Sequence, residues 1–222
     1  MKKLVIIGIG ETANLAYEYF TYDSDYEVAA FAVDKEYISE SSFKGLPVVD
    51  FAEVEKLYSP EKYDAFVALA SGKLNRDRTK MYFKTKEKGY HLASYVSSHA
   101  FVWHNVKIGD NCFIMEDNTL QPFTSVGNNV VMWSGNHLGH QSHIGNNCFI
   151  TSHVVISGMV EIGDNTFIGV NSTIADKVKI APDNFIAMGS VISKNTLENT
   201  IYKGNPAEAA KISAKMFCKV KE

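Results

Sequence analysis

Four of the seven histidines lie close together in the sequence, at His137, His140, His143 and His153. A neutral imidazole is the side chain best suited to accept a proton near pH 7. Transfer of an acyl group from a thioester to an amine or a hydroxyl needs such a base, because the attacking group must lose a proton. The cluster therefore predicts at least one catalytic histidine. His140 is the strongest candidate, because its spacing places it at a corner of the fold, where it can project into a cleft.

The elements that position these histidines repeat every six residues. From Val96 to Ile192, every sixth residue is a medium-to-large aliphatic one, seventeen in succession. The residue two positions earlier is small, and the residue that follows is often glycine. This period fits neither an α-helix nor a simple strand. It predicts a hexapeptide solenoid, a parallel β-helix with three short strands per coil.

The residues just before the aliphatic positions should point outward and form three ladders with an 18-residue step. One ladder is apolar: Phe113, Val131, Phe149, Phe167 and Phe185. Water should not contact such a patch. We expect it to pack against a neighbouring subunit, and the alternative is that the C-terminal helix of the same chain covers it.

The first 95 residues alternate between buried strands and helices. Strands are expected at residues 4–7, 27–33 and 65–70, and helices at 11–20, 51–57 and 76–88. The turn that begins with Gly8 and Gly10 could present helix amides to a phosphate, and Asp34, after the second strand, could accept from a sugar hydroxyl. The alternative for this glycine turn is a purely structural contact between strand and helix. We expect a small Rossmann-like half.

Composition limits the class of protein. The net charge of −3 argues against nucleic acid as the main partner. No apolar run approaches the length of a membrane span, and the N-terminus leads directly into a strand, so the sequence predicts a cytoplasmic protein. Cys112 and Cys148 should lie two coils apart, about 10 Å, which is too far for a disulfide.

Taken together, the chain resembles the bacterial hexapeptide sugar acyltransferases that carry a small nucleotide-sugar-binding domain before a left-handed β-helix. It is most similar to N-acetyltransferases that acetylate a nucleotide-linked 4-amino sugar, as in bacillosamine-type glycan synthesis, and sialic acid O-acetyltransferases share the architecture. The residues that carry the resemblance are the Gly8/Gly10 turn, Asp34, Ser98-His99-Ala100, the His140 region, Ile156-Ser157-Gly158 and the run from Tyr202 to Ala207.

The resemblance implies a fold class and a domain organisation. The fold class is an α/β N-terminal Rossmann-like domain followed by a left-handed parallel β-helix (hexapeptide repeat) and a short C-terminal helix. The boundaries are 1–95 for the nucleotide-sugar-binding domain, 96–194 for the β-helix acyltransferase domain and 195–222 for the C-terminal segment. The resemblance also implies a homotrimer with active sites at subunit interfaces, acetyl-CoA as co-substrate and no metal.

Residue roles follow from the same resemblance. His140 would be the general base, and Gln141 stands where an acid usually orients it. Gly158 would donate its N–H to the acetyl carbonyl. Met188, Gly189, Lys203, Gly204 and Pro206 would bind the rest of acetyl-CoA. The nucleotide-linked amino sugar would be bound by Gly8, Gly10, Glu11, Asp34 and Asn75.

Three other functions compete with N-acetylation. O-acetylation of a sugar hydroxyl would use the same base and fold, and the neutral Gln141 keeps this alternative open. A zinc enzyme like the hexapeptide carbonic anhydrases needs three histidines that converge on one metal, whereas His137, His140 and His143 should point in different directions. A non-catalytic scaffold would leave the histidine cluster and the segment after Tyr202 without a role.

Overall fold

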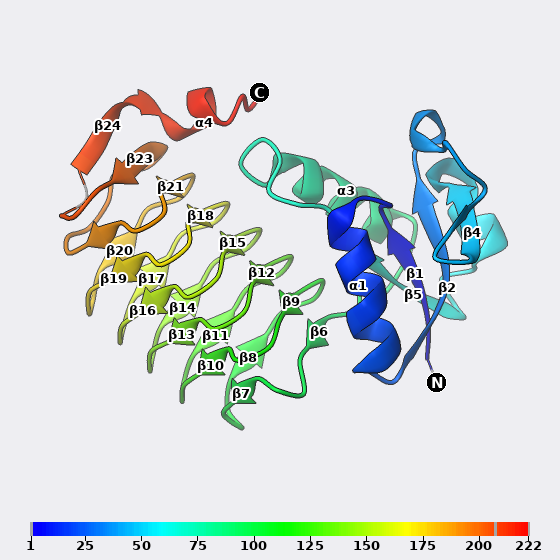
Figure 1. Ribbon diagram of the computed structural model, residues 1–222, viewed down its shortest axis with the longest axis horizontal. Coiled ribbons are helices and arrows are strands. Elements are labelled where there is room, and N and C mark those ends of the chain that lie inside the picture. Colours follow the sequence, from blue (N-terminus) through cyan, green and yellow to red (C-terminus); the bar gives the residue numbers. More distant parts are fainter. Residues whose placement is uncertain (1, 207, 222) are drawn as a thin grey trace. The chain divides into compact units, whose positions relative to one another are not determined.

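The structure, a computed structural model, describes residues 2–206 and 208–221. The chain divides into two compact units. One contains residues up to 70 together with 78–95. The other contains residues 71–77 and everything from residue 96 onward, and it is the larger of the two (Figure 1).

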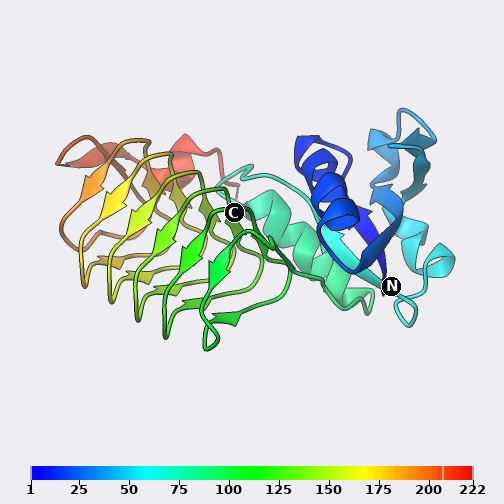
Figure 2. The same ribbon diagram turned by 60° about the horizontal axis from the view of Figure 1, so that its bottom comes forward.

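The larger unit is a left-handed parallel β-helix whose strands from β6 to β22 have two residues each, followed by the longer β23 and β24. Three sheets form its walls: the eight-stranded sheet (β6, β9, β12, β15, β18, β21, β23, β24), the six-stranded sheet (β7, β10, β13, β16, β19, β22) and the β8–β20 sheet (β8, β11, β14, β17, β20). Figure 2 shows the coils from the side on which the triangular section can be followed. The strands are β6 (Tyr95–Val96), β7 (Phe101–Val102), β8 (Lys107–Ile108), β9 (Phe113–Ile114), β10 (Thr119–Leu120), β11 (Ser125–Val126), β12 (Val131–Met132), β13 (His137–Leu138), β14 (His143–Ile144), β15 (Phe149–Ile150), β16 (Val155–Ile156), β17 (Glu161–Ile162), β18 (Phe167–Ile168), β19 (Thr173–Ile174), β20 (Lys179–Ile180), β21 (Phe185–Ile186), β22 (Val191–Ile192), β23 (Thr200–Lys203) and β24 (Glu208–Ser213).

The six-residue period produces this coil because each aliphatic side chain stacks on its equivalent one coil away. Leu120, Leu138 and Ile156, for example, follow one another in register through the six-stranded sheet, and all three are fully buried. The small residue two positions earlier also points inward. Asn118 and Asn136 fill such positions, and their amides bond each other and carbonyls of the coil. The interior is therefore a dry aliphatic column with polar groups satisfied at its corners.

A backbone feature that also repeats every six residues forms the corners of the coil. From Asn111 to Gly189, one residue per corner has φ between 51° and 75°. This left-handed conformation is costly for most side chains but is tolerated by Gly, Asn and Asp. Nine of these positions hold such residues: Asn111, Asp117, Asn129, Gly135, Asn147, Asn165, Asn171, Asp183 and Gly189.

The apolar ladder of the eight-stranded sheet is covered by the chain itself. Phe113, Val131 and Phe149 are between 0% and 6% exposed. Phe167 and Phe185 pack on a cluster that includes Leu74 and residues of the C-terminal segment. Phe185 also meets the Phe217 ring edge-on at 5.1 Å. The expectation that this ladder forms the contact with a neighbouring subunit is therefore wrong, because no large area of it remains for a second copy.

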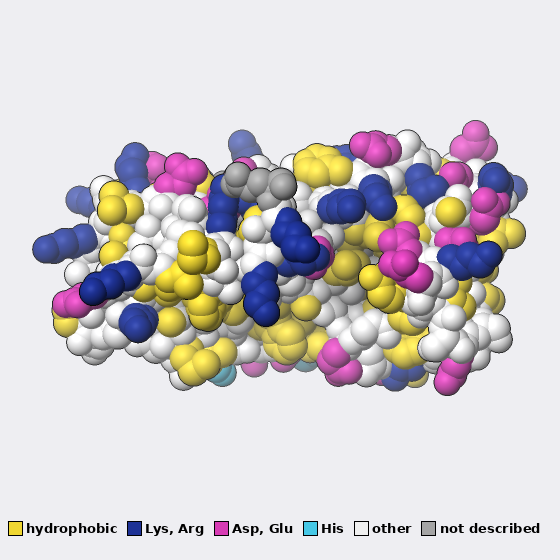
Figure 3. All heavy atoms as spheres, turned by 90° about the horizontal axis from the view of Figure 1, so that it is seen from above, with side chains coloured by type: hydrophobic (Ala, Val, Ile, Leu, Met, Phe, Trp, Pro, Cys, Tyr) yellow, Lys and Arg dark blue, Asp and Glu magenta, His cyan; other side chains and the backbone are white. Residues whose placement is uncertain are grey.

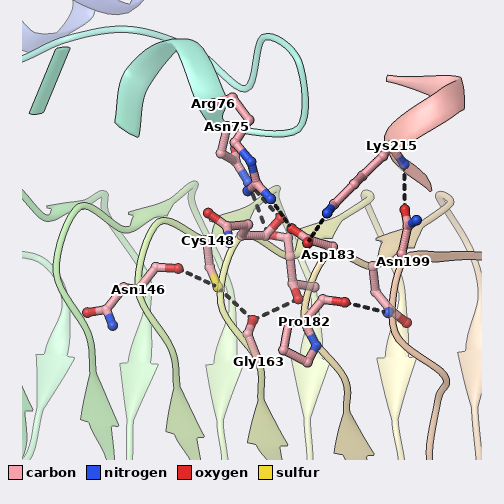
Figure 4. Close-up of polar contacts among 12 residues, drawn as sticks. Asn75, Arg76, Asn146, Cys148, Gly163, Pro182, Asp183, Asn199 and Lys215 are labelled. Atoms are coloured by element: carbon pink, nitrogen blue, oxygen red, sulfur yellow. Dashed lines mark hydrogen bonds and ion pairs between the residues drawn. The ribbon is translucent and has the colours of Figure 1, made fainter. Parts of the chain in front are cut away.

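The C-terminal segment is fastened to the solenoid by a buried carboxylate. Asp183 lies at a corner and is 5% exposed. Its Oδ1 accepts from Arg76 Nη2 at 2.5 Å, and its Oδ2 lies 3.4 Å from Nζ of Lys215 in α4 (Ala214–Phe217) (Figure 4). Nearby, the side-chain oxygen of Asn199 accepts from the backbone N–H of Lys215 at 2.8 Å. One carboxylate thus joins residues 71–77, the solenoid corner and the C-terminal helix.

The substitution Asp183→Asn tests this contact, because asparagine keeps the shape and the left-handed backbone but removes the charge. We expect it to weaken docking of the C-terminal segment by about 2 kcal/mol. Amide hydrogens of residues 218–220 should then exchange about 30-fold faster by mass spectrometry. Glu161→Gln is the control, since Glu161 pairs with an exposed Lys179, and unchanged exchange in Asp183→Asn would contradict the assignment.

The smaller unit contains a sheet of order β3-β4-β2-β1-β5. Strands β1, β2, β4 and β5 are parallel, and β3 pairs antiparallel with β4 as a hairpin. The elements are β1 (Lys2–Ile7), α1 (Glu11–Tyr22), β2 (Tyr26–Val33), the 3-10 turn η1 (Lys35–Tyr37), β3 (Ser42–Phe43), β4 (Leu46–Asp50), the 3-10 turn η2 (Phe51–Glu53), α2 (Val54–Leu57), β5 (Tyr63–Val67) and α3 (Arg76–Glu87).

The expected fold class is wrong in its first part, because the chain carries no separate Rossmann-like domain. A Rossmann half places a helix in each crossover between parallel strands. Here the connection from β2 to β4 is a 3-10 turn and the β3 hairpin, and residues 71–77 group with the solenoid. The sequence between Ile38 and Gly45 is rich in serine, lacks helical periodicity and forms a turn instead. Most of the chain is β-helix with few helices, and its parallel sheets and hexapeptide repeat agree with the expectation.

Candidate functional site

His140 lies in the turn between β13 and β14, where the six-stranded sheet meets the β8–β20 sheet. We call this turn, Gly139–Ser142, and its stacked equivalents the His140 corner. The backbone N–H of His140 donates to Gln121 Oε1 at 2.9 Å, and its carbonyl accepts from Met159 N–H at 2.9 Å. The backbone is thus held by the coils on both sides, and the side chain is exposed. An exposed imidazole on a rigid corner can meet a substrate.

The imidazole lies directly over Gly158, one coil along. A Cβ built on Gly158 would be 2.6 Å from His140 Nε2 and 2.7 Å from Cε1, closer than real atoms approach. Glycine at this position is therefore what allows the ring its place.

The expected role of Gly158 as a hydrogen-bond donor to the acetyl group does not match this geometry. Its N–H already donates to Asp176 Oδ1 at 2.8 Å. An occupied N–H cannot stabilise an oxyanion unless the carboxylate moves away. The structure instead gives Gly158 the role of making room for His140. Asp176 was missed by the sequence reasoning, although it lies one 18-residue step beyond Gly158.

Gln141 makes no hydrogen bond to the His140 imidazole within the described part of its own chain. It has φ of 58° and an exposed side chain. Within residues 2–206 and 208–221, neither the Gln141 side chain nor the His140 imidazole has a hydrogen-bond partner. The His140 imidazole therefore lies on a fixed backbone, and its ring N–H has no acceptor among the described residues.

The other three histidines of the cluster point elsewhere. His137 faces outward from β13, and His143 faces outward from β14 with its Nδ1 2.8 Å from Ser125 Oγ. His153 lies in the turn between β15 and β16, where its ring covers Gly135. In the described part of the chain, no group of three His, Cys, Asp or Glu side chains could hold a metal ion.

The residues expected to bind acetyl-CoA lie towards the last coils. Met188, which is 78% exposed, and Gly189 occupy the turn between β21 and β22, which is not the His140 corner. Lys203 ends β23, Gly204 accepts from Val191 N–H, and Pro206 borders a cavity of about 310 Å³ beside Lys194. Ala207 lies outside the described residues.

A separate pocket of about 500 Å³ lies within the smaller unit, at the carboxyl ends of β1, β2 and β5. Gly8, Gly10, Glu11 and Asp34, which the resemblance assigns to the nucleotide sugar, all line it, and Tyr37 and Met81 add apolar surface. Gly8 has φ of 127°, and an added Cβ would be 2.9 Å from the carbonyl oxygen of Ala68, so only glycine fits. Gly10 precedes the free amides of α1, which favour an anionic group.

Asn75 does not belong to this pocket. It is 0% exposed and donates to the carbonyl of Asn165 at 3.2 Å, inside the solenoid unit (Figure 4). The expectation that it binds the nucleotide sugar is wrong, because its amide is used to seat residues 71–77 on the solenoid.

Two surface properties bear on possible partners. Lysine and arginine side chains on the face shown in Figure 3 are interspersed with acidic and apolar ones rather than joined into a basic surface. No helix in the described ranges is long and apolar enough to cross a membrane.

Comparison with known proteins agrees with the fold. Residues 159–194 match the bacterial transferase hexapeptide (six repeats) family model. A search of curated proteins finds no match.

Solved structures are similar over nearly the whole chain. A histidine-to-asparagine variant of perosamine N-acetyltransferase from Caulobacter crescentus, in complex with CoA and GDP-perosamine, is 22% identical with a TM-score of 0.85, and covers 96% of this chain and 98% of that one. The acetyltransferase domain of PglB from Neisseria gonorrhoeae is 23% identical with a TM-score of 0.85, over 95% and 100% of the two chains. WeeI from Acinetobacter baumannii is 19% identical with a TM-score of 0.62, over 95% and 100%. At these identities the likeness establishes the fold.

Proposed function

We propose that the protein is an acetyl-CoA-dependent N-acetyltransferase that acts on the amino group of a nucleotide-linked amino-dideoxy sugar, in the cytoplasm. The observation that carries the proposal is the exposed imidazole of His140, fixed on a solenoid corner above Gly158. The pocket lined by Gly8, Gly10 and Asp34 supplies a place for the nucleotide. Two of the structural neighbours support the same reaction, since their names give them as acetyltransferases: the perosamine enzyme, in complex with CoA and GDP-perosamine, and the PglB domain, which is also solved with acetyl coenzyme A.

The reaction balances with one base. The neutral sugar amine attacks the thioester carbonyl carbon and forms a C–N bond, and His140 accepts the proton that the nitrogen loses. The tetrahedral intermediate collapses and the C–S bond breaks. The sulfur of CoA then takes up the proton that His140 received from the amine. The products are the N-acetylated nucleotide sugar and free CoA, and His140 returns to its neutral form.

The proposal includes an assembly and a division of labour along the chain. Three copies form a closed ring with sites between solenoids. Residues 1–95 hold the nucleotide, 96–194 carry the base, and 195–222 with Met188 and Gly189 hold the far end of acetyl-CoA. O-acetylation of a sugar hydroxyl, with the same base and fold, is the second candidate, and the neutral Gln141 keeps it open.

A CoA-release assay tests the function. Acetyl-CoA is offered with UDP-, dTDP- and GDP-linked 3-amino and 4-amino dideoxysugars and with the matched hydroxy-sugars, and free thiol is measured. Release with one amino sugar alone is the expected result. Release with hydroxy-sugars alone would replace N-acetylation by O-acetylation, and absence of both release and CoA binding would overturn an acyltransferase.

Asp34→Ala probes the nucleotide pocket. If its carboxylate accepts from a hydroxyl of the nucleotide sugar, we expect KM for that substrate to rise about 10–100-fold, with KM for acetyl-CoA unchanged. Glu36→Ala is the control, because Glu36 lies two residues after Asp34, in the turn that follows β2, and does not line this pocket. Steady-state kinetics with each substrate varied in turn measures both constants, and an unchanged sugar KM in Asp34→Ala would remove this residue from the site.

A further inference from the structure

One wall of the solenoid exposes apolar side chains, interspersed with the polar Thr119, His137 and Thr173. The six-stranded sheet exposes Phe101 at 53% and Val155 at 42%. The two rows of turns that border it also expose apolar side chains: Trp103, Phe123 and Met159 on the His140 corner, and Val170 and Met188 on the opposite one. The eight-stranded sheet is covered by its own chain, and the β8–β20 sheet presents lysine, serine, histidine and glutamate. The six-stranded sheet is therefore the wall that favours contact with a second copy.

The turns that lead from the eight-stranded sheet into the six-stranded sheet carry an acidic side chain, Glu116, whereas His140 has no acidic partner among the described residues of its own chain. We call Trp133–Asn136 and its stacked equivalents the Ser134 corner. Ser134 Oγ donates to Glu116 Oε1 at 2.5 Å, one coil apart on this corner. Both side chains are partly exposed. This hydroxyl and carboxylate could accept the ring N–H of a histidine and stabilise its cation, but on a single chain they lie across the wall from His140.

Cyclic assembly brings the two corners together. If the six-stranded sheets of three copies face a common axis parallel to the solenoids, the His140 corner of each copy meets the Ser134 corner of the next. Rotation about such an axis leaves every residue at its height. Ser134 precedes His140 by six residues, a third of a coil, or about 1.6 Å at a strand spacing of about 4.8 Å. The charges match as well, because a histidine that gains a proton meets a carboxylate.

We propose that, in a site between copies, Oγ of the partner subunit's Ser134 accepts the ring N–H of His140, and that the partner subunit's Glu116, one coil away, orients this hydroxyl through the hydrogen bond between them. The inference rests on the proposed function and makes Ser134 and Glu116 positioning residues. It also places the partner subunit's Met188 on the C-terminal side of the same groove, beside Met159. The row of residues on the Ser134 corner turns from polar at Glu116, Ser134 and Ser152 to apolar at Val170 and Met188. The sugar therefore enters from the polar side and the pantetheine arm from the apolar side.

Mixed assemblies test whether the site is shared. His140→Ala and Glu116→Gln are coexpressed with different affinity tags, and trimers that carry both tags are purified. In every such trimer, one of the three junctions joins an intact His140 to an intact Glu116, so kcat per trimer should return to about a third of the wild-type value. His140→Ala coexpressed with the double variant His140→Ala/Glu116→Gln has no intact junction and is the matched control. Activity no higher than the mean of the two single variants would overturn the proposal.

Crosslinking tests the same contact without any assay of activity. Ser134→Cys combined with Gln141→Cys should form disulfides between copies and give covalent trimers on a non-reducing gel. Ser134→Cys combined with Lys179→Cys, on the β8–β20 wall, should not. The native Cys112 and Cys148 are buried, and the partly exposed Cys218 is replaced by serine in both combinations. Monomer alone from the first pair overturns the shared site even if the substrate is still unknown, whereas trimers without any acetyl transfer would count against the proposed function only.

A pH profile separates positioning from a structural role. A carboxylate close to an imidazole favours its protonated form, so removal of that charge should disfavour protonation. In Glu116→Gln we therefore expect kcat to fall about 10–100-fold and its acidic limb to move to lower pH, with KM unchanged. Glu116→Asp should restore part of kcat. A fall in kcat with the limb unmoved would contradict the role.

Discussion

Replacement of His140 by alanine is expected to lower kcat for acetyl transfer about 10²–10⁴-fold, because the variant loses the exposed imidazole that is proposed to accept the proton of the attacking amine. The fold should survive, since the His140 side chain is exposed and the corner is held by its backbone N–H and carbonyl. KM for both substrates should change little. Steady-state kinetics and the thermal unfolding midpoint measure the two effects.

His143→Ala is the matched control for this substitution. His143 lies three residues further along the same coil, on the outer face of β14, and bonds Ser125. Its loss should leave kcat within about twofold of wild type, as surface substitutions away from a site do. If His140→Ala retained activity within tenfold of wild type, the assignment of the base would be wrong.

Gly158→Ala should lose activity while keeping its fold. The new methyl group would meet the tip of the His140 ring at 2.6 Å. A ring tip can swing away, so the cost in stability is small, but the base then leaves its position. A displacement of about 1 Å can reduce the rate about 10²-fold. We expect a fall in kcat of that order, with an unfolding midpoint close to that of the wild type.

Gly139→Ala shows the opposite behaviour and so serves as the comparison. Its added Cβ would be 2.6 Å from the carbonyl carbon of Ser157. Backbone of the next coil cannot swing away, so the coils must separate and the unfolding midpoint should fall. If both variants lost stability equally, the special relation between Gly158 and His140 would not hold.

Much of the solenoid follows from its sequence because its contacts are local in the coil. Each aliphatic residue needs only its equivalents 18 residues away, so a strict period of six is enough to place Leu138 or Ile156 in the core. The same period is present in the left-handed corner residues, such as Asn111, Asn129 and Asn147. The Asn, Asp and Gly residues at these positions are thus a second sequence signal for the corners of the coil.

The smaller unit was harder to predict. Its helices α1 and α3 and its strands β1 and β2 lie within a few residues of expectation, since apolar periodicity marks them. Strands β3 and β4 were not predicted, because the hairpin between Ser42 and Asp50 is short and half polar. The crossover helix implied by a Rossmann half is consequently missing.

The errors at the site concern side chains whose partners are distant in sequence. From the sequence, Asn75 looks like a polar loop residue. Only the fold shows that its side chain donates a hydrogen bond to the backbone carbonyl of Asn165. From the sequence, the N–H of Gly158 would be available to a ligand, but in the fold it donates a hydrogen bond to the Asp176 carboxylate. The apolar ladder reads as an interface until the last residues of the chain are found on it.

The hairpin of β23 and β24 has a consequence for how the protein behaves at high concentration. A parallel β-helix exposes unpaired N–H and carbonyl groups at its last coil, and such edges recruit strands from other molecules. Here β23 pairs in parallel with β21, and β24 pairs antiparallel with β23. The last strand at this edge of the eight-stranded sheet therefore runs opposite to the others. A further coil of the same kind cannot be added in register on that wall. The C-terminal segment therefore opposes the end-to-end stacking of a second solenoid on this wall.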